Sequence, residues 1–382
     1  MRLSLKEKVL PHMTVTNLEL KDFRNFSDLS LSLDKGINIF YGRNAQGKTN
    51  ILEALYTGCT SKSQRAAKDR EVIRFGCEEA HVKANIEKND VPYRIDIHIK
   101  KNKAKGIAIN GSPVRKVSDL FGIANVVAFS PEDLGLIKNG PAERRRFMDM
   151  ELCQLDRVYM HDLISYNKVV DQKNKVLKNL LEKREKISGA KEMLSVYNEQ
   201  MVVYGSSVIE RRRKFIRDLN EIILEIHRRL TGGAEELKLV YEENIKESDF
   251  AAALALQADR EKRNGMALIG PHRDDMGFKC SGIDLRHFGS QGQQRTAALS
   301  LKLAEIDLVE RITGDKPLLL LDDVLSELDK GRQDMLLDSI HDIQTVITCT
   351  GIDDLLERRF RMDRVFMVEH PEVRLVSRTG EM

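Results

Sequence analysis

Hydrophobic and polar residues alternate along much of the first third of the chain, in the pattern of half-buried β-strands. A strand is predicted to begin at Met13, and others are expected at 29–33 and 94–100, where every second residue is apolar. Asn110-Gly111 lies between two short apolar runs and predicts a hairpin turn. The wholly apolar run 126–129 predicts a strand buried on both faces.

The pattern changes to helical spacing after Pro141. Residues 142–231 contain no proline, and their apolar residues recur every three or four positions. This spacing predicts two or more long amphipathic helices, broken near Gly189 and ended by Gly232-Gly233. We assign a helical lobe, or short arm, to residues 141–262.

Short apolar strands return near the C-terminus. The runs 318–321 and 345–349 flank a helix predicted from about Lys330 to residue 341. Apolar strands joined by a helix indicate a parallel sheet covered on both faces. Residues 1–12 join no such pattern and are interpreted as an N-terminal extension.

Composition narrows the class of protein. The chain has 382 residues, of which 41% are hydrophobic, and 62 basic against 59 acidic residues give a net charge of +3. This balance excludes a largely disordered chain and a uniformly basic DNA-coating protein. No apolar run approaches the roughly 20 residues of a membrane-spanning helix. The five cysteines are far apart and form no CxxC pair, so we expect neither a disulfide framework nor a zinc site, and a reducing, cytoplasmic location.

The strongest local motif is a P-loop. Residues 42–49 read G-x-x-x-x-G-K-T, after an apolar run and before an amphipathic segment, which is the strand–loop–helix context that the motif requires. Glycines allow backbone N–H groups to surround phosphates, while the lysine neutralises their charge. The residues expected to bind ATP here are Gly42, Arg43, Asn44, Ala45, Gln46, Gly47, Lys48 and Thr49.

Two carboxylates follow the apolar run 318–321. Asp322 is expected to bind Mg²⁺ together with the Thr49 hydroxyl, and Asp323 to orient the attacking water as a base. Lys48 and Asp323 are therefore the predicted catalytic residues. The alternative is that both aspartates simply begin a surface loop.

A third motif lies about 30 residues before the aspartates. Ser290 and Gln293 have capping-box spacing, which predicts a helix start and a local anion site. Its position resembles that of the signature motif of ABC-type ATPases, and 326–329 resembles their D-loop. In that class both elements complete the nucleotide site of a second copy, which implies ATP contacts for Ser290, Gly292, Gln293 and Asp329.

One departure from the ABC pattern concerns the switch histidine. Thr350 stands at its expected place, after the strand 345–349. A hydroxyl can contact a phosphate but cannot supply the charge of an imidazolium. We therefore expect ATP hydrolysis to be slow.

Four longer stretches carry a specific resemblance. Residues 20–26, 131–149, 270–275 and 289–295 resemble the RecF family of bacterial ATPases, which is related to SMC proteins, and the resemblance runs from Met13 to near the C-terminus. It implies an α/β fold: a two-lobed ABC/SMC-like P-loop ATPase head with a helical second lobe. The ATPase domain would then comprise residues 13–140 and 263–382.

The same resemblance implies a function in recombinational DNA repair and replication. ATP would drive homodimerisation on gapped or junction DNA, slow hydrolysis would release it, and RecO and RecR would be partners in loading RecA. An ABC transporter subunit and an SMC-like structural tether are the alternatives. The missing switch histidine and the arm argue against the first, and the arm's shortness against the second.

Three basic stretches are candidate DNA contacts, although a solvated surface is the commoner fate of such runs. The third, Arg211 to Arg217, lies on the arm. The roles of Arg144-Arg145-Arg146 and of His272-Arg273 stay open between nucleotide sensing and structural pairing. The candidates of the first two stretches are Lys62, Arg65, Lys68, Lys101, Lys103 and Lys105.

Overall fold

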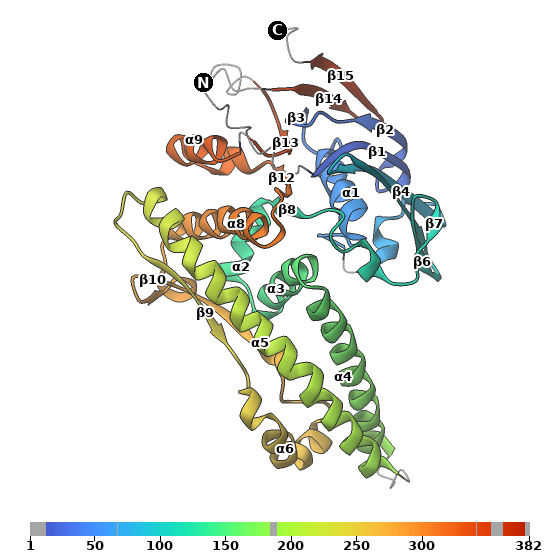
Figure 1. The fold of residues 1–382 in the computed structure, drawn as a ribbon, viewed down its shortest axis with the longest axis vertical. Coiled ribbons are helices and arrows are strands. Elements are labelled where there is room, and N and C mark those ends of the chain that lie inside the picture. The colour runs from blue at the N-terminus through green and yellow to red at the C-terminus, as the bar shows by residue number, and fades with distance from the viewer. Residues whose placement is uncertain (1–12, 67, 184–188, 341, 353–361, 379–382) are drawn as a thin grey trace, which may run out of the picture. The chain divides into compact units, whose positions relative to one another are not determined.

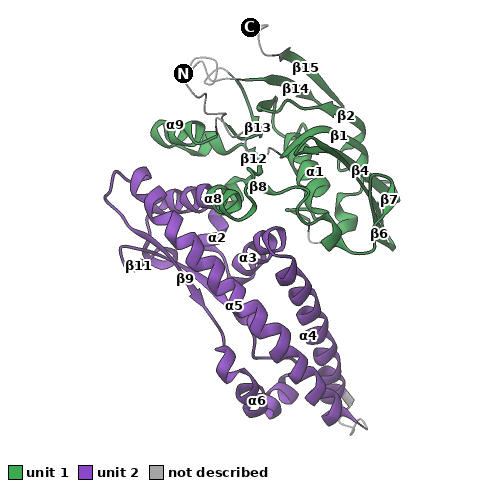
Figure 2. Cartoon of the chain, viewed as in Figure 1, with its two compact units in different colours: residues 1–133, 305–382 green, residues 134–304 purple. Residues whose placement is uncertain are grey.

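The computed structural model describes residues 13–66, 68–183, 189–340, 342–352 and 362–378 (Figure 1). The extension predicted for residues 1–12 lies outside the described residues. The chain divides into two compact units, unit 1 with residues 1–133 and 305–382 and unit 2 with residues 134–304 (Figure 2). Unit 2 is longer than the predicted lobe 141–262, because it also contains a three-stranded sheet and the start of the helix that carries the signature motif.

Unit 1 contains an antiparallel sheet built from the alternating stretches of the sequence. Its strand order is β2-β1-β4-β5-β6-β7. The predicted hairpin at Asn110-Gly111 joins β6 to β7, with positive φ angles of 52° and 81° at these two residues. The strands are β1 (Met13–Phe23), β2 (Phe26–Ser32), β4 (Glu79–Lys88), β5 (Val91–Lys100), β6 (Lys103–Ile109) and β7 (Ser112–Pro113).

The second sheet of unit 1 has the order β15-β14-β3-β13-β12-β8. All of its strands except β15 run parallel, so their carboxyl ends share one edge. The predicted buried strands at 126–129, 318–321 and 345–349 are confirmed as neighbours here. The strands are β3 (Ile37–Tyr41), β8 (Val126–Phe129), β12 (Leu318–Asp322), β13 (Thr345–Cys349), β14 (Arg364–Glu369) and β15 (Glu372–Arg378).

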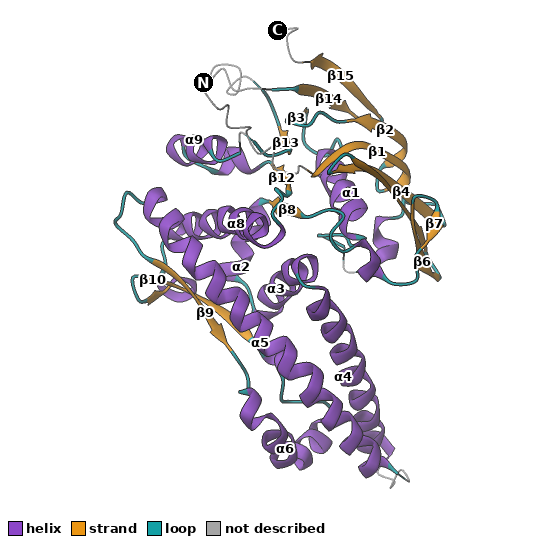
Figure 3. Cartoon of the chain, in the orientation of Figure 1, coloured by secondary structure: helices purple, strands orange, loops and turns teal. Residues whose placement is uncertain are grey.

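One helix connects the two sheets. Helix α1 (Lys48–Thr60) contacts strands of both, and its central residues are buried between them (Figure 3). Helix α9 (Lys330–Asp338) follows β12. Short 3₁₀ turns complete the unit: η1 (Asp69–Val72), η2 (Val117–Leu120) and η6 (Val324–Glu327).

Unit 2 is dominated by the helices that the sequence predicted. Helix α5 has 41 residues and is preceded by Gly189 in the left-handed conformation, with φ 77°, so at 1.5 Å per residue it is about 60 Å long. The sheet β11-β10-β9 packs on α5 through β9. No helix among the described residues is both long and apolar enough to span a membrane. The helices are α2 (Gly135–Lys138), α3 (Pro141–Leu155), α4 (Arg157–Lys183), α5 (Ala190–Leu230), α6 (Phe250–Asn264), α7 (Leu285–Phe288) and α8 (Gln291–Thr313), and the strands are β9 (Leu237–Glu242), β10 (Asp275–Cys280) and β11 (Ile283–Asp284).

Candidate nucleotide-binding site

The P-loop joins β3 to α1 and depends on its two outer glycines. Gly47 caps α1 with φ +103°, and a Cβ there would lie 2.5 Å from Nδ2 of Asn25. A Cβ on Gly42 would lie 2.3 Å from the carbonyl oxygen of Val368. Larger residues would therefore push the loop away from its neighbours and fill the space that its backbone N–H groups surround.

Lys48 supplies the positive charge of this loop. Its side chain is almost wholly buried, and Nζ donates hydrogen bonds to the carbonyl oxygens of Gly42 (2.6 Å) and Arg43 (3.0 Å). An ammonium group held inside a glycine-bounded turn at a helix N-terminus suits phosphate oxygens. The residues present thus fit a nucleoside triphosphate.

The aspartates after β12 lie beside the first turn of α1. The Thr49 hydroxyl donates to Oδ1 of Asp322 over 2.9 Å, and the Thr348 hydroxyl donates to the same oxygen over 2.7 Å. Hydroxyl and carboxylate oxygens are ligands that Mg²⁺ prefers, so Thr49 and Asp322 fit the metal role predicted for them. Thr348 was not predicted as a site residue. It lies near the end of the predicted strand 345–349, which the sheet places beside the strand that ends at Asp322.

Asp323 has an unusual backbone conformation for a non-glycine residue, with φ 53°. Its N–H group donates to the carbonyl oxygen of Thr348 (3.2 Å) and to its hydroxyl (3.0 Å), which anchors the turn. Burial, helped by the charge of Asp322 and opposed by that of Lys48, raises the pKa of the Asp323 carboxyl. A raised pKa moves a carboxylate toward the range in which it is a more effective base at neutral pH.

The turn after β1 braces the P-loop. Nδ2 of Asn25 donates to the carbonyl oxygen of Gln46 (3.3 Å) and lies 3.1 Å from Nδ1 of His370. Gln46 in turn accepts the N–H group of His370 over 2.9 Å, and Asn50 donates to Asn25 over 2.8 Å. The stretch 20–26, which resembles the family, is therefore in direct contact with the P-loop through Asn25. His370 was not predicted, because only the sheet brings it beside the loop.

The other predicted nucleotide contacts of unit 1 lie outside this hydrogen-bonded centre. Asp329 caps α9, accepts the N–H group of Arg332 over 3.1 Å and forms an ion pair with its guanidinium. That backbone N–H is the main reason why the pKa of Asp329 is lowered. Thr350 is exposed directly after β13.

The signature motif begins α8 in unit 2, and its capping box is confirmed. The Ser290 N–H donates to Oε1 of Gln293 (2.9 Å), and the Gln293 N–H donates to the Ser290 hydroxyl (3.2 Å). Nε2 of Gln293 also donates to Oε1 of Glu235 over 2.9 Å, which fixes the side-chain amide at both ends. Gly292 is exposed between them. Glu235 lies 58 positions away and was not predicted.

The stretches around Arg144 and Asp275 form a buried polar network in unit 2. Arg144 binds Asp275 with two hydrogen bonds of 2.6 and 2.8 Å. Arg212 contacts Asp149 (2.7 Å) and the fully buried Asp274 (3.1 Å). Of the two roles left open for Arg144, structural pairing is therefore the one that these contacts support.

The same network narrows the DNA-contact hypothesis for the arm. Arg212 is only 2% exposed and is unavailable to DNA. Arg211 forms an ion pair with Asp156 (2.8 Å), and Arg213 is bound by two glutamates of the segment after β9. Lys214 and Arg217 of the same stretch are exposed, so only these two of its five basic residues are exposed and outside the ion pairs of Arg211, Arg212 and Arg213.

His272 is likewise a structural hydrogen-bonding residue. Its Nδ1 lies 2.6 Å from the Tyr166 hydroxyl, and its Nε2 lies 3.3 Å from the carbonyl oxygen of Ala267. Burial lowers the pKa of the His272 imidazole to about 4, so it is neutral at physiological pH.

The two other basic stretches meet beyond the C-terminal end of α1. Nζ of Lys105 donates to the carbonyl oxygen of Ser61 and lies 3.2 Å from Asp69. Lys62, Arg65 and Lys68 are exposed, as is Lys103, whereas Lys101 is paired with Glu78 at 2.7 Å. The stretches that lie apart in sequence therefore form one surface.

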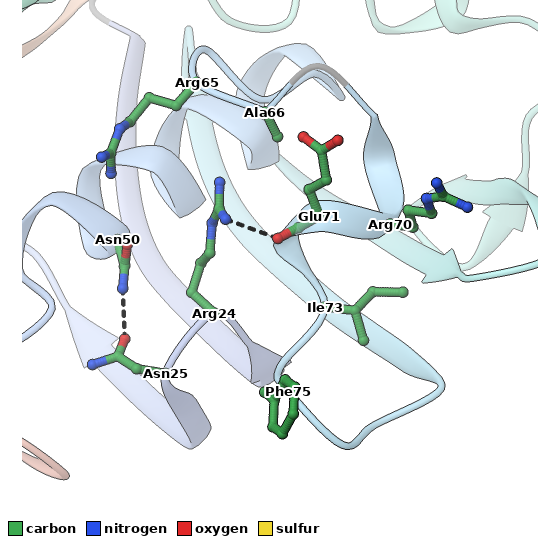
Figure 4. A pocket seen from close by; sticks show the side chains of 9 residues that line it. All are labelled: Arg24, Asn25, Asn50, Arg65, Ala66, Arg70, Glu71, Ile73 and Phe75. Carbon is green, nitrogen blue, oxygen red and sulfur yellow. Dashed lines mark hydrogen bonds between the residues drawn. The ribbon is translucent and has the colours of Figure 1, made fainter.

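A pocket of about 810 Å³ opens on this surface (Figure 4). Arg24, Arg65 and Arg70 supply three guanidinium groups to its lining, and the exposed ring of Phe75 lies at one side. Arg70 belongs to the first of the basic stretches that the sequence offered as DNA contacts, whereas Phe75 was not predicted. Arg24 is also held by Glu53, through hydrogen bonds of 2.7 and 2.6 Å.

Comparison with known proteins gives the family of the chain. The family model for the RecF/RecN/SMC N-terminal domain matches residues 14–373. The chain is 52% identical to the DNA replication and repair protein RecF of Lachnoclostridium phytofermentans, over 93% of this chain and 98% of that protein. It is 51% identical to RecF of Agathobacter rectalis, over 96% and 100%.

Solved structures give the same result for the fold. The recombination mediator protein RecF, solved with ATP and described as part of the RecFOR pathway, is 30% identical with a TM-score of 0.89, over 97% of this chain and all of that chain. An Smc head domain from Pyrococcus furiosus is 16% identical with a TM-score of 0.54, over 95% of this chain and 96% of that chain. The second likeness concerns the ATPase-head fold alone.

Proposed function

The chain belongs to the RecF family of DNA replication and repair ATPases, and from this premise we propose that it is an ATP-gated, dimerising DNA-binding switch. The observation that carries the proposal is the convergence of Lys48, Thr49, Asp322 and Asp323 at one edge of the parallel sheet, through the Thr49–Asp322 hydrogen bond of 2.9 Å. Such a convergence is what phosphoryl transfer to water requires.

Each residue has a distinct task at this edge. The P-loop N–H groups and Lys48 bind the phosphates and neutralise their charge. Thr49 and Asp322 hold Mg²⁺, which supplies charge stabilisation to the phosphate oxygens when bound. Asp323 accepts a proton from the attacking water, while the Thr348 hydroxyl holds the Asp322 carboxylate and the backbone N–H of Asp323.

The remaining contacts come from a second copy of the chain. Ser290, Gly292 and Gln293 of that copy present the N-terminus of its α8 to the γ-phosphate bound by the first copy, and its Asp329 reaches the same site from a helix cap. Thr350, at the place of the switch histidine in the chain that binds the ATP, contacts the phosphate through a hydroxyl rather than an imidazolium. Dimerisation is thereby tied to ATP, and hydrolysis is slow enough for the bound dimer to persist.

DNA binds through phosphate contacts of the surface that contains Lys62, Arg65, Lys68, Lys103 and Lys105. The preferred DNA is gapped or has a single-strand/double-strand junction. RecR and RecO are the partners, since a 30% identical relative is described within the RecFOR pathway.

The test measures dimerisation and DNA binding together with ATP, with ADP and without nucleotide. The wild-type chain should dimerise and bind DNA with ATP only. Asp323→Asn should hydrolyse ATP more slowly and accumulate as the ATP dimer, because it lacks the base but keeps Lys48, Thr49 and Asp322.

Asp338→Asn is the matched control, since it makes the same chemical change at an exposed position on α9. The control should follow the wild type in every assay. An Asp323→Asn chain that dimerises with ATP no better than the wild type would contradict the composite site.

A further inference from the structure

Three side chains with metal-binding atoms lie close together in unit 2, and one of them, Glu235, is hydrogen-bonded to Gln293 of the signature motif. His227 lies in the last turn of α5, Glu235 in the segment before β9, and Cys280 at the end of β10. Their ligand atoms all lie within 4.8 Å of one another. His227 and Cys280 are buried, so the group is not an incidental cluster of surface charges.

The hydrogen bonds around His227 orient its ring. The Ser300 hydroxyl donates to the carbonyl oxygen of Thr296 over 2.8 Å, so its oxygen is available to accept from Nδ1 of His227, also at 2.8 Å. This arrangement places the ring proton on Nδ1 and leaves the Nε2 lone pair directed to Oε2 of Glu235, 3.5 Å away. A second-shell hydrogen bond to one imidazole nitrogen, with the metal on the other nitrogen, is the usual arrangement of a metal-ligating histidine.

Cys280 completes the group from the other side. Its Sγ lies 3.4 Å from the same Oε2 of Glu235. Nε2 of His227 and Oε2 of Glu235 thus face each other with their electron pairs, and a cation between them would remove their repulsion. This cation can be a proton or a metal ion.

Two of the three spacings, those to Oε2 of Glu235, match the spacings of a tetrahedral zinc site, and the third is below 4.8 Å. With Zn–S near 2.3 Å and Zn–N or Zn–O near 2.0–2.2 Å, ligand atoms at tetrahedral angles lie about 3.3–3.6 Å apart. The two measured separations, 3.5 and 3.4 Å, fall within that range. A thiolate, an imidazole and a carboxylate favour Zn²⁺ over Mg²⁺ or Ca²⁺.

We propose that His227, Glu235 and Cys280 form a Zn²⁺-binding site that braces the signature motif. Binding replaces the Cys280 thiol proton, which leaves to solvent, and the fourth position is open to water. Oε1 of Glu235 keeps its 2.9 Å hydrogen bond with Gln293, so the ion fixes the carboxylate that holds the signature side chain. Only this last consequence depends on the proposed role of the signature motif.

The test uses Co²⁺ as a spectroscopic probe and Zn²⁺ as its competitor. The full-length chain, stripped with chelator, should bind one equivalent of Co²⁺ and develop a thiolate-to-cobalt charge-transfer band that added Zn²⁺ abolishes. Cys280→Ser should lack this band. His227→Gln and Glu235→Gln should each weaken Co²⁺ binding by at least about tenfold.

Cys77→Ser is the matched control, because Cys77 is partly exposed in unit 1 and contacts Asp22 instead. The control should keep the full charge-transfer band. The proposal is overturned if the wild-type chain develops no such band, which means that a proton occupies the cluster, or if the band persists in Cys280→Ser. ATP-dependent dimerisation is scored separately, so failure of the metal site leaves the ATP switch to its own test.

Discussion

Thr49 donates a hydrogen bond to Asp322 although the two residues lie 273 positions apart in the sequence. The contact joins the start of α1 to the end of β12, two elements that the parallel sheet brings to one edge. A site of this kind requires both segments of unit 1. Neither segment alone contains the phosphate loop and the aspartates together.

Thr348 should be important for ATP hydrolysis but not for nucleotide binding. Thr348→Val removes the hydroxyl that donates to the Asp322 carboxylate and accepts from the Asp323 backbone N–H, so Asp322 loses one of its two hydroxyl partners and the turn that carries Asp323 is held less firmly. We expect kcat to fall by at least about tenfold, with a much smaller change in ATP affinity. Thr345→Val, on the same strand and equally buried, should have little effect on kcat. Equal losses in the two variants would indicate damage to the strand rather than to the site.

Lys62 and Arg65 should contribute to DNA affinity through phosphate contacts. The double substitution Lys62→Ala/Arg65→Ala should weaken binding and reduce the slope of log K against log salt by about 2, at about 0.9 per lost contact. Lys178→Ala/Lys262→Ala removes the same charge from exposed helix surfaces of unit 2. If both doubles changed the slope equally, net charge rather than this surface would account for DNA binding.

Arg212 should be much more important for stability than its neighbour in sequence. Arg212→Ala would leave Asp274 buried without its ion-pair partner, so we expect a loss of about 3–5 kcal/mol in the free energy of unfolding. Arg213 is 43% exposed, and for Arg213→Ala we expect a loss below about 1 kcal/mol. Denaturant titration of both variants provides the comparison. Similar losses would contradict the structural role of the buried network.

His272 should make the protein less stable in mild acid. Its folded-state pKa of about 4 lies below the ordinary value of 6.5, so between these values the unfolded chain binds a proton that the folded chain does not. His272 therefore does not lower the free energy of unfolding above pH 6.5. As the pH falls toward 4, it lowers this free energy by no more than about 3 kcal/mol.

Urea unfolding between pH 4 and 7 measures this dependence. His272→Gln should flatten it, whereas His161→Gln, at an exposed position on α4, should not. An unchanged slope in His272→Gln would assign the acid sensitivity to other groups.

The sequence alone predicted the elements in which the local environment restricts the residue types. Apolar runs such as 318–321 are confirmed as buried parallel strands, and Asn110-Gly111 as a hairpin turn, because burial and positive φ angles restrict the residue types that can occur there. The P-loop and the capping box at Ser290 were also evident, since their function depends on contiguous backbone geometry.

Tertiary structure decided the contacts between distant residues. Charge in the sequence could not tell that Arg212 is buried while Lys62 is exposed, because both belong to basic runs. Thr348 and Glu235 gave no local signal, as each acts on a motif far away in the chain. Likewise, the cysteine spacing gave no metal motif, yet folding brings Cys280 to His227 and Glu235. Local motifs are set by neighbours in sequence, whereas burial and pairing are set by which elements pack together.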